Sequence, residues 1–217
     1  MVFCFSGIDF EDAICEYGEM FSPNDLILFS RNVLGTVDMP SQLNGKSDEL
    51  RRLIEYGKEK EIIIIACMRA KIGGEYYNSA AVIDKGRIMG VSDELSPLGG
   101  YIGGSVMRSY VTSIGKICLY IDSDVCYPQL WQSAMKGCRY VFSLNSCKMD
   151  SQRLLSARSL ANAVGKYVLC RFEDCGVCVN YLGGVESVKW GKMSAFYLPM
   201  TIARCKRLDK IRFMEEI

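Results

Sequence analysis

The chain has 217 residues, of which 49% are hydrophobic and 24% charged, and these values are ordinary for a globular protein. Lys and Arg residues number 26 and Asp and Glu residues 25, so the net charge of +1 gives no basic field that would favour nucleic acid or a membrane surface. There are 11 cysteines and no histidine, which excludes Ser-His and Cys-His catalysis and any His-ligated metal site.

The first part of the chain alternates short apolar runs with helical patterns. We predict strands at 2–5, 25–29 and 62–67, and helices at 10–20 and from position 47 onward. Ser47 is expected to cap the second helix, with Asp48 and Glu49 in its first turn, where the helix dipole favours acids. A hairpin of 76–84 and 87–89 and a glycine-rich loop at 96–104 should follow.

The second part continues the alternation without long linkers or internal repeats. The predicted strands are 116–121, 140–144, 167–170, 178–181, 185–189 and 194–198, and the predicted helices are 129–136 and 150–164. Gly137 is a good residue to end the first of these helices. The pattern predicts an α/β or α+β sandwich, with residues 1–217 forming a single domain.

The cysteines mostly lie in apolar runs, where free cysteine packs as a small buried hydrophobe in a reducing compartment. Cys170, Cys175 and Cys178 have the C-x4-C-x2-C spacing of plant-type ferredoxin ligands, and Cys205 is a candidate fourth ligand. The alternative is a chance spacing around a turn between two strands, so we expect no metal and no cofactor. The N-terminus lacks a signal-peptide pattern and no apolar run reaches about 18 residues, which predicts a cytoplasmic protein that does not span a membrane.

Three stretches carry motifs that belong together. Residues 115–129 read GKICLYIDSDVCYPQ, residues 77–90 read YNSAAVIDKGRIMG, and residues 25–31 read DLILFSR. These resemble the G-K-I-G-V-x-I-C-x-D-x-x-F-P-E block, the Y-N-x-A-x-V-I-x-x-G-x-I-x-G hairpin and the D-L-I-V-F-P-E segment of the carbon–nitrogen hydrolase (nitrilase) superfamily. The resemblance implies a four-layer α-β-β-α sandwich that cleaves nitriles and amides with a Cys nucleophile, a Glu base and a Lys that stabilises the oxyanion.

The positions that match this catalytic triad hold other residues. Arg31 stands at the Glu position and Asp122 at the Cys position. The Lys position falls among Ser92, Asp93 and Glu94, and no lysine occurs between positions 85 and 116. A carboxylate is a far poorer nucleophile toward an amide than a thiolate, and loss of a charged oxyanion donor costs about 3–4 kcal/mol. We therefore predict that thiol-dependent hydrolysis is lost.

The replacement residues indicate what the site has become. We predict that Arg31 pairs with Asp122, either as an ion pair that plugs an unused cavity or as part of a pocket, with Asp93 and Glu94, that binds a small polar or zwitterionic ligand. One alternative is an active hydrolase with a shifted nucleophile, Cys126, although no neighbouring base or cation is evident to activate it. Another is a protein-interaction scaffold.

The C-terminal segment is locally basic. Its cations are Arg204, Lys206, Arg207, Lys210 and Arg212. A solvated helix face is the simpler interpretation, and a dimer contact or an acidic partner is the alternative. The family resemblance implies a homodimer, and we expect neither nucleic acid nor a membrane as a partner.

Overall fold

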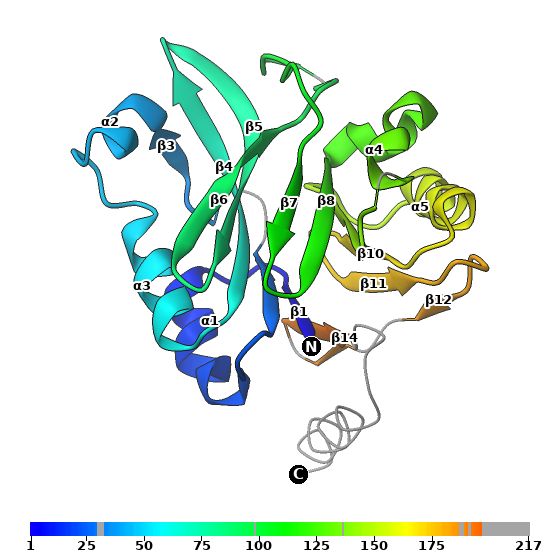
Figure 1. Ribbon diagram of the computed structural model, residues 1–217, viewed down its shortest axis with the longest axis horizontal. Helices are drawn as coiled ribbons and strands as arrows, with labels where there is room; N and C mark the ends of the chain where they lie inside the picture. The colour runs from blue at the N-terminus through cyan, green and yellow to red at the C-terminus, as the bar shows by residue number, and fades with distance from the viewer. Residues whose placement is uncertain (30–32, 98, 136, 187–188, 191, 197–217) are drawn as a thin grey trace.

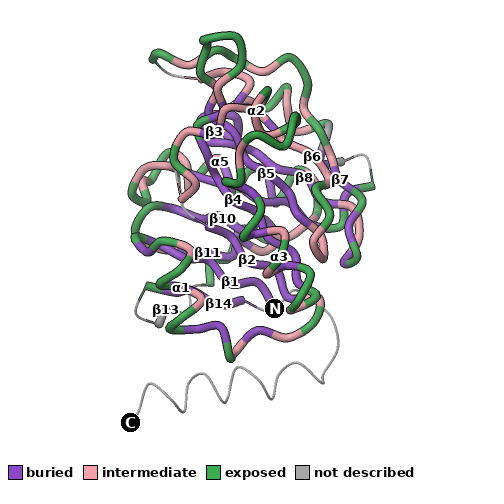
Figure 2. Tube along the Cα trace, turned by 90° about the vertical axis from the view of Figure 1, so that its left-hand side faces the viewer, coloured by how far each residue is buried: buried purple, intermediate pink, exposed green. Residues whose placement is uncertain are grey.

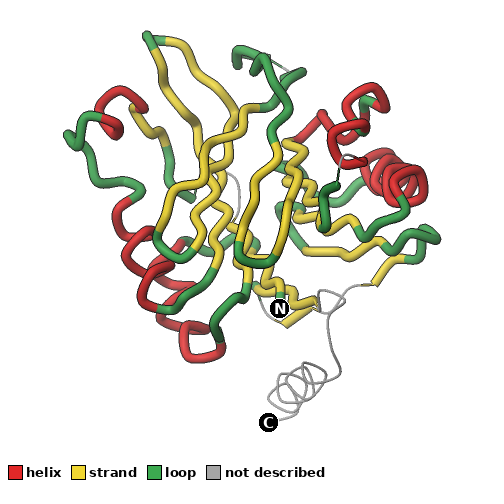
Figure 3. The backbone as a smooth tube through the Cα atoms, viewed as in Figure 1, coloured by secondary structure: helices red, strands yellow, loops and turns green. Residues whose placement is uncertain are grey.

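Two β-sheets stacked face to face form the centre of the computed structural model, which describes residues 1–217 except 30–32, 98, 136, 187–188, 191 and 197–217. Helices cover the outer face of each sheet (Figures 1 and 3). The layer order is helix, sheet, sheet, helix, and this confirms the predicted α-β-β-α sandwich.

The first sheet contains both ends of the described chain. Its strand order is β13 (Lys189–Trp190), β14 (Met193–Phe196), β1 (Val2–Phe5), β2 (Leu26–Phe29), β4 (Ile63–Ile72), β5 (Glu75–Asp84) and β6 (Arg87–Asp93), and β3 (Thr36–Asp38) pairs with β4. The outer face of this sheet is covered by α1 (Phe10–Tyr17) with the 3₁₀ turn η1 (Gly18–Met20), α2 (Met39–Leu43) and α3 (Arg51–Glu59) (Figure 1).

The second sheet is built from the later part of the chain. Its strand order is β12 (Val185–Glu186), β11 (Gly176–Val179), β10 (Val168–Arg171), β9 (Tyr140–Leu144), β8 (Gly115–Ile121) and β7 (Ser109–Thr112). The segment between β8 and β9 forms η2 (Asp122–Cys126), η3 (Pro128–Leu130) and α4 (Gln132–Met135), and α5 (Ser151–Val164) follows β9.

Alternating side chains on the strands divide the core into three layers. On β8, Ile117 and Leu119 point into the core between the sheets, whereas Cys118 and Tyr120 point toward the helices. The same alternation holds on β1, where Phe3 packs under the helices of the first sheet. Because both faces of a central strand are buried, these strands read as continuous apolar runs (Figure 2).

Helix α5 begins and ends where the sequence predicts. The Asp150 carboxylate accepts the backbone N–H of Arg153 at 2.8 Å, and Gly165 ends the helix with a left-handed φ of 65°. None of the helices in the described part of the chain is both long enough and apolar enough to cross a membrane.

Three local predictions were wrong or incomplete. The helix expected to start at Ser47 begins at Arg51, and the Ser47 hydroxyl instead donates to the side chain of Gln42 at 3.2 Å. The helix predicted at 129–136 is broken into η3 and the short α4. The elements β3, α2 and β7 were not predicted, although Asp38 capping the backbone N–H of Ser41 at 2.9 Å, with Pro40 in the first turn, is a recognisable helix start.

Candidate functional site

The candidate site lies where β8 ends, between the two sheets. Asp122 follows the last residue of β8 and has a φ of 45°, in the left-handed region that few residues other than glycine adopt. Asp and Asn tolerate this region better than most side chains do. The turn ends the strand abruptly and starts η2, so the Asp122 carboxylate leaves the sheet and faces β5 of the opposite sheet.

Asn78 joins two buried carboxylates. Its side-chain nitrogen, on β5, donates to Glu94 Oε2 and to Asp122 Oδ2, both at 2.7 Å. Glu94 and Asp122 are only 3% and 7% exposed. A side-chain amide has two N–H donors, so Asn78 gives one to each acid and thereby links the first sheet to the end of β8.

Serines hold the other oxygen of each carboxylate. Asp122 Oδ1 accepts the backbone N–H and the hydroxyl of Ser146, both at 2.6 Å. Glu94 Oε1 accepts the backbone N–H of Ser123 at 3.0 Å, and the Ser123 hydroxyl lies within donor distance of both Glu94 Oε1, at 2.7 Å, and the Ser96 backbone oxygen, at 2.6 Å. That hydroxyl has one proton to share between them. Both carboxylates are therefore positioned by neutral donors, three for Asp122 and two or three for Glu94, without a direct ion pair among the described residues.

The two carboxylates open onto a small polar cavity of about 140 Å³. Its lining residues all have polar side chains: Asn78, Glu94, Tyr101, Asp122, Ser123, Ser146 and Arg153. Arg153, on the first turn of α5, is the one cation that the described residues contribute to that lining. Its Nη1 donates to Asp150 at 2.9 Å, and its Nε is buried with no hydrogen-bond partner among the described residues.

Asp124 anchors the turn from behind. Its carboxylate, 1% exposed, accepts the backbone N–H of Leu95 at 3.0 Å and that of Ser96 at 3.2 Å. Burial, with a smaller contribution from the charge of Glu94, raises the pKa of Asp124 to about 7 against the lowering effect of the backbone donors. Asp124 does not line the cavity. It fixes the loop that follows β6 onto η2, and so holds Glu94 beside Ser123.

A buried arginine lies beneath the cavity floor. Arg171, on β10, is 1% exposed and donates to the backbone oxygens of Phe5 at 3.2 Å and Asn145 at 2.9 Å. It borders a smaller void together with Asp122 and Cys67. Burial lowers the pKa of Arg171. The positive charge of Arg171 partly offsets the negative charge of Asp122 at the cavity floor.

The structure brings together some of the residues named from the sequence and separates others. Glu94 and Asp122 share the cavity. Asp93 lies outside its lining, with its carboxylate accepting the Ser79 hydroxyl at 2.6 Å. Cys126 also lies outside it, half-buried at the end of η2 and packed toward the helices. Arg31 is outside the described residues, so its pairing with Asp122 stays a prediction.

Sequence reasoning missed the cavity residues that come from distant segments. Asn78 sits inside one of the motifs but shows no signal of its own, and Ser146 follows β9 in an ordinary polar stretch. Arg153 could have been flagged only as a cation at the start of a helix, where it opposes the dipole.

The cysteine spacing near the end of the chain does not produce a ligand set. Cys170 packs toward the helices, whereas Cys178 faces the core between the sheets. Because their side chains leave opposite faces of the sheet, they cannot ligate one ion. In the described part of the chain, no three His, Cys, Asp or Glu side chains converge closely enough to hold a metal. Cys205 lies outside that part.

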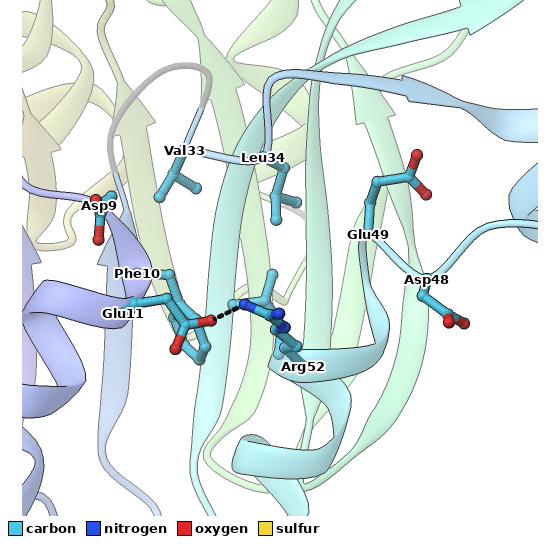
Figure 4. A pocket seen from close by; sticks show the side chains of 9 residues that line it. Asp9, Phe10, Glu11, Val33, Leu34, Asp48, Glu49 and Arg52 are labelled. Atoms are coloured by element: carbon cyan, nitrogen blue, oxygen red, sulfur yellow. Dashed lines mark hydrogen bonds and ion pairs between the residues drawn. The ribbon is translucent and has the colours of Figure 1, made fainter.

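A larger groove of about 290 Å³ lies on the helical surface of the first sheet (Figure 4). It is lined by Asp9, Phe10, Glu11, Val33, Leu34, Asp48, Glu49, Arg52 and Leu53. Glu11 and Arg52 form an ion pair of 2.6 Å across it, and both side chains are well exposed. Two exposed charges that pair with each other are screened by water and already have partners. The carboxylate cavity is therefore the stronger candidate site.

Comparison with known protein structures identifies the fold. No protein-family model and no curated protein sequence matches this chain. A carbon–nitrogen hydrolase from Helicobacter pylori G27 is similar in structure, with 17% identity, a TM-score of 0.68, and coverage of 89% of this chain and 87% of that chain. Saccharomyces cerevisiae Nit3, a member of branch 10 of the nitrilase superfamily, matches with 15% identity, a TM-score of 0.68, and coverage of 98% and 93%.

An amidase from Nesterenkonia sp. is also similar, with 15% identity, a TM-score of 0.71, and coverage of 98% of this chain and 95% of that chain. At these identities the likeness concerns the course of the backbone, and it extends over nearly the whole chain. The protein therefore has the fold of the carbon–nitrogen hydrolases of the nitrilase superfamily.

Proposed function

We propose that this chain is a carbon–nitrogen hydrolase-like protein that has lost thiol-dependent hydrolysis and binds a small polar ligand carrying an ammonium group. The observation that carries the proposal is the pair of buried carboxylates, Glu94 and Asp122, which open onto one polar cavity and are held in place by neutral donors. Among the described residues neither acid forms a direct ion pair, and the cations beside the cavity are Arg153 in its lining and Arg171 beneath it. A ligand that brings further positive charge would offset more of the cost of burying two acids.

The hydrogen bonding leaves room for such a group. A carboxylate offers about four acceptor sites; Asp122 uses three of them, and Glu94 uses two or three, because the Ser123 hydroxyl shares its proton with the Ser96 oxygen. An unused site on each acid is on the oxygen that also accepts from Asn78, so both open sites lie close to the same nitrogen. An ammonium group, with three donors and a positive charge, matches two adjacent acceptors.

The volume of the cavity and the charge of Arg153 in its lining restrict the size and the chemistry of the rest of the ligand. A cavity of about 150 Å³ holds a molecule of benzene size, and the cavity here is about 140 Å³. Arg153, which lines the cavity, places a positive charge beside an anionic or carbonyl end of the same ligand. A zwitterion of about six non-hydrogen atoms, such as a small amino acid, combines both features.

The described residues of the cavity do not include the groups that thiol chemistry needs. A point mutant of the Nesterenkonia amidase shows Michael addition of acrylamide at its active-site cysteine, whereas the described residues that line the cavity here include neither a cysteine nor a lysine. The alternative, hydrolysis through Cys126, has less support because this half-buried thiol packs toward the helices. The alternative of a protein-interaction scaffold, and the homodimer, would depend on the outer surface of the protein, and the cavity gives no support to either.

A thermal-shift and calorimetric screen tests binding directly. The probes are small amines and amino acids such as alanine. Each is matched with an analogue of similar size in which an uncharged group replaces the ammonium group. We expect the amines to stabilise the wild-type protein, by about 2.7 kcal/mol when the ligand is at 100 times its Kd. Equal stabilisation by amines and neutral analogues, or none by either, would contradict the proposal.

An activity screen on small amides and nitriles separates the two leading alternatives. We expect no turnover by the wild-type protein, and the double variant Asp122→Cys/Arg31→Glu restores two of the three triad positions for comparison. Wild-type turnover that disappears in Cys126→Ser would establish the shifted nucleophile instead.

A further inference from the structure

The surface groove beside α1 and α3 combines an apolar floor with an acidic rim (Figure 4). The floor includes Phe10, Val33 and Leu34. The described residues around it contribute four carboxylates against one guanidinium, and the carboxylates belong to Asp9, Glu11, Asp48 and Glu49. The groove therefore surrounds a hydrophobic surface with an excess of negative charge.

Only part of this negative charge is neutralised within the described part of the chain. Glu11 pairs with Arg52 at 2.6 Å, and Asp48 lies 3.7 Å from Arg51. Glu49 forms neither a hydrogen bond nor an ion pair with a described residue. An apolar groove with unpaired acids at its rim matches a segment that is both hydrophobic and basic.

The C-terminal segment of the same chain has this composition. Residues 204–212 contain five cationic side chains and one acid. Arg204, Arg207, Leu208 and Ile211 have the spacing i, i+3, i+4 and i+7, so on a helix they would share one face. This is the spacing by which an amphipathic helix anchors in a hydrophobic groove. The segment thus offers an apolar pair flanked by arginines to an apolar floor flanked by acids.

The chain leaves β14 close enough to the groove for this segment to reach it. Phe196 pairs with Val2 at one end of β1, and Asp9 at the groove follows the other end of that strand. A strand of this length covers about 13 Å, and the helix layer adds about 10 Å. The chain from Phe196 to Arg204 spans about 26 Å when extended. A tether this short keeps the segment at a high local concentration beside the groove.

We propose that residues 204–212 dock in the groove of their own molecule, with Leu208 and Ile211 against the apolar floor and the arginines beside the acids. The docked segment bridges α1 and α3 on the outer surface of the first sheet. Because exposed ion pairs are weak and are screened by salt, the contact is reversible and weakens as the salt concentration rises. It does not depend on the amine-binding cavity, which lies between the two sheets.

Hydrogen–deuterium exchange of the full chain, measured by mass spectrometry, tests the docking. We expect the amides of residues 204–212 to be protected in the wild type. They should exchange about tenfold faster in Asp48→Lys/Glu49→Lys, which replaces two attractions at the rim by repulsions. The matched control, Glu19→Lys/Glu59→Lys, reverses two exposed acids of the same helix layer that lie outside the groove. It should leave the protection unchanged.

A charge swap shows whether the two surfaces meet each other. Arg204→Glu/Arg207→Glu changes no contact of the described residues and should lose the protection as well. Combined with Asp48→Lys/Glu49→Lys, it should regain most of it, because the opposite charges face each other again. Exchange of the buried β4 amides reports in every variant that the fold is intact.

Four results would overturn the proposal. The first is free exchange of residues 204–212 in the wild type, which would leave the groove to another partner. The second is protection that survives reversal of the rim charges, and the third is protection that the control variant removes. The fourth is protection that falls when the protein is diluted, since this would assign the groove to the C-terminal segment of a second copy.

Discussion

Two aspartates in the same 3₁₀ turn have opposite surroundings. Asp122 faces an open polar cavity and is held by side chains and one backbone N–H from other segments, including Asn78 and Ser146. Asp124 is enclosed, and its oxygens accept backbone N–H groups from Leu95 and Ser96. An acid held by side chains at a cavity is available to a ligand, whereas an acid that accepts backbone donors holds a loop in place. Two residues of the same type can therefore serve binding and architecture separately.

The largest effect should come from removing the enclosed acid. We expect Asp124→Ala to lower the free energy of unfolding by about 2–4 kcal/mol, because the partly buried amides of Leu95 and Ser96 lose their acceptor. Asp122→Asn is the matched control, since it keeps a residue that tolerates a left-handed turn and should cost about 1 kcal/mol or less. Urea unfolding monitored by tryptophan fluorescence measures both. Equal losses would erase the distinction between the two acids.

Ligand affinity should depend on Asp122 and Glu94, the acids that line the cavity, although a change at Asp122 has the smaller effect on stability. We expect Asp122→Asn and Glu94→Gln each to weaken binding of a small amine at least tenfold, because a hydrogen bond to a charged group contributes about 1.5–3 kcal/mol. Isothermal titration calorimetry gives the affinities. Asp93→Asn, a change in an acid outside the cavity, serves as the control and should leave the affinity unchanged. An amine that binds both cavity variants as tightly as the wild type would place its site elsewhere.

The enclosed acid should also give stability a pH dependence. Its folded-state pKa is about 7, well above the usual value of 3.8, so between these pH values the unfolded chain has released a proton that the folded chain retains. The unfolding free energy contributed by Asp124 is therefore fully present below the lower value and falls as pH rises, by at most about 1.4 kcal/mol per pH unit, until it levels off above pH 7.

Denaturation at several pH values between 5 and 8 measures this slope. The difference between wild type and Asp124→Asn isolates the contribution of one group, because the remaining titratable groups are shared. Parallel stability curves for the two proteins would show that Asp124 does not hold a proton in the folded state.

The smallest effect should distinguish amino acids from simple amines. We expect Arg153→Met to weaken binding of an amino acid by about fivefold, roughly 1 kcal/mol, and to leave a monofunctional amine unaffected or slightly tighter, because the variant removes a donor and a positive charge. Competition calorimetry with both ligand types measures the ratio. A uniform loss for both would mean that Arg153 only shapes the cavity.

Local sequence patterns predicted the elements whose signals lie within a few residues. The capping by Asp150 and the end at Gly165 locate α5, and the apolar alternation through Ile117 and Leu119 locates β8. The same reasoning failed at Ser47, where a good capping residue is used for a contact with Gln42 instead. A local signal predicts an element only when no other contact, here one from five residues earlier in the chain, competes for the same side chain.

The sequence by itself predicted most of the strands and helices in their order, the four-layer fold through its resemblance to a known family, and the presence of Asp122 where that family has its nucleophile. Only the tertiary structure decided that Glu94 meets Asp122 through Asn78, and that Arg153 is the cation among the described residues of the cavity lining. The physical reason is distance along the chain. Strand and helix periodicity depend on neighbours within a turn or two, whereas these contacts depend on how two sheets and their connecting turns pack against each other.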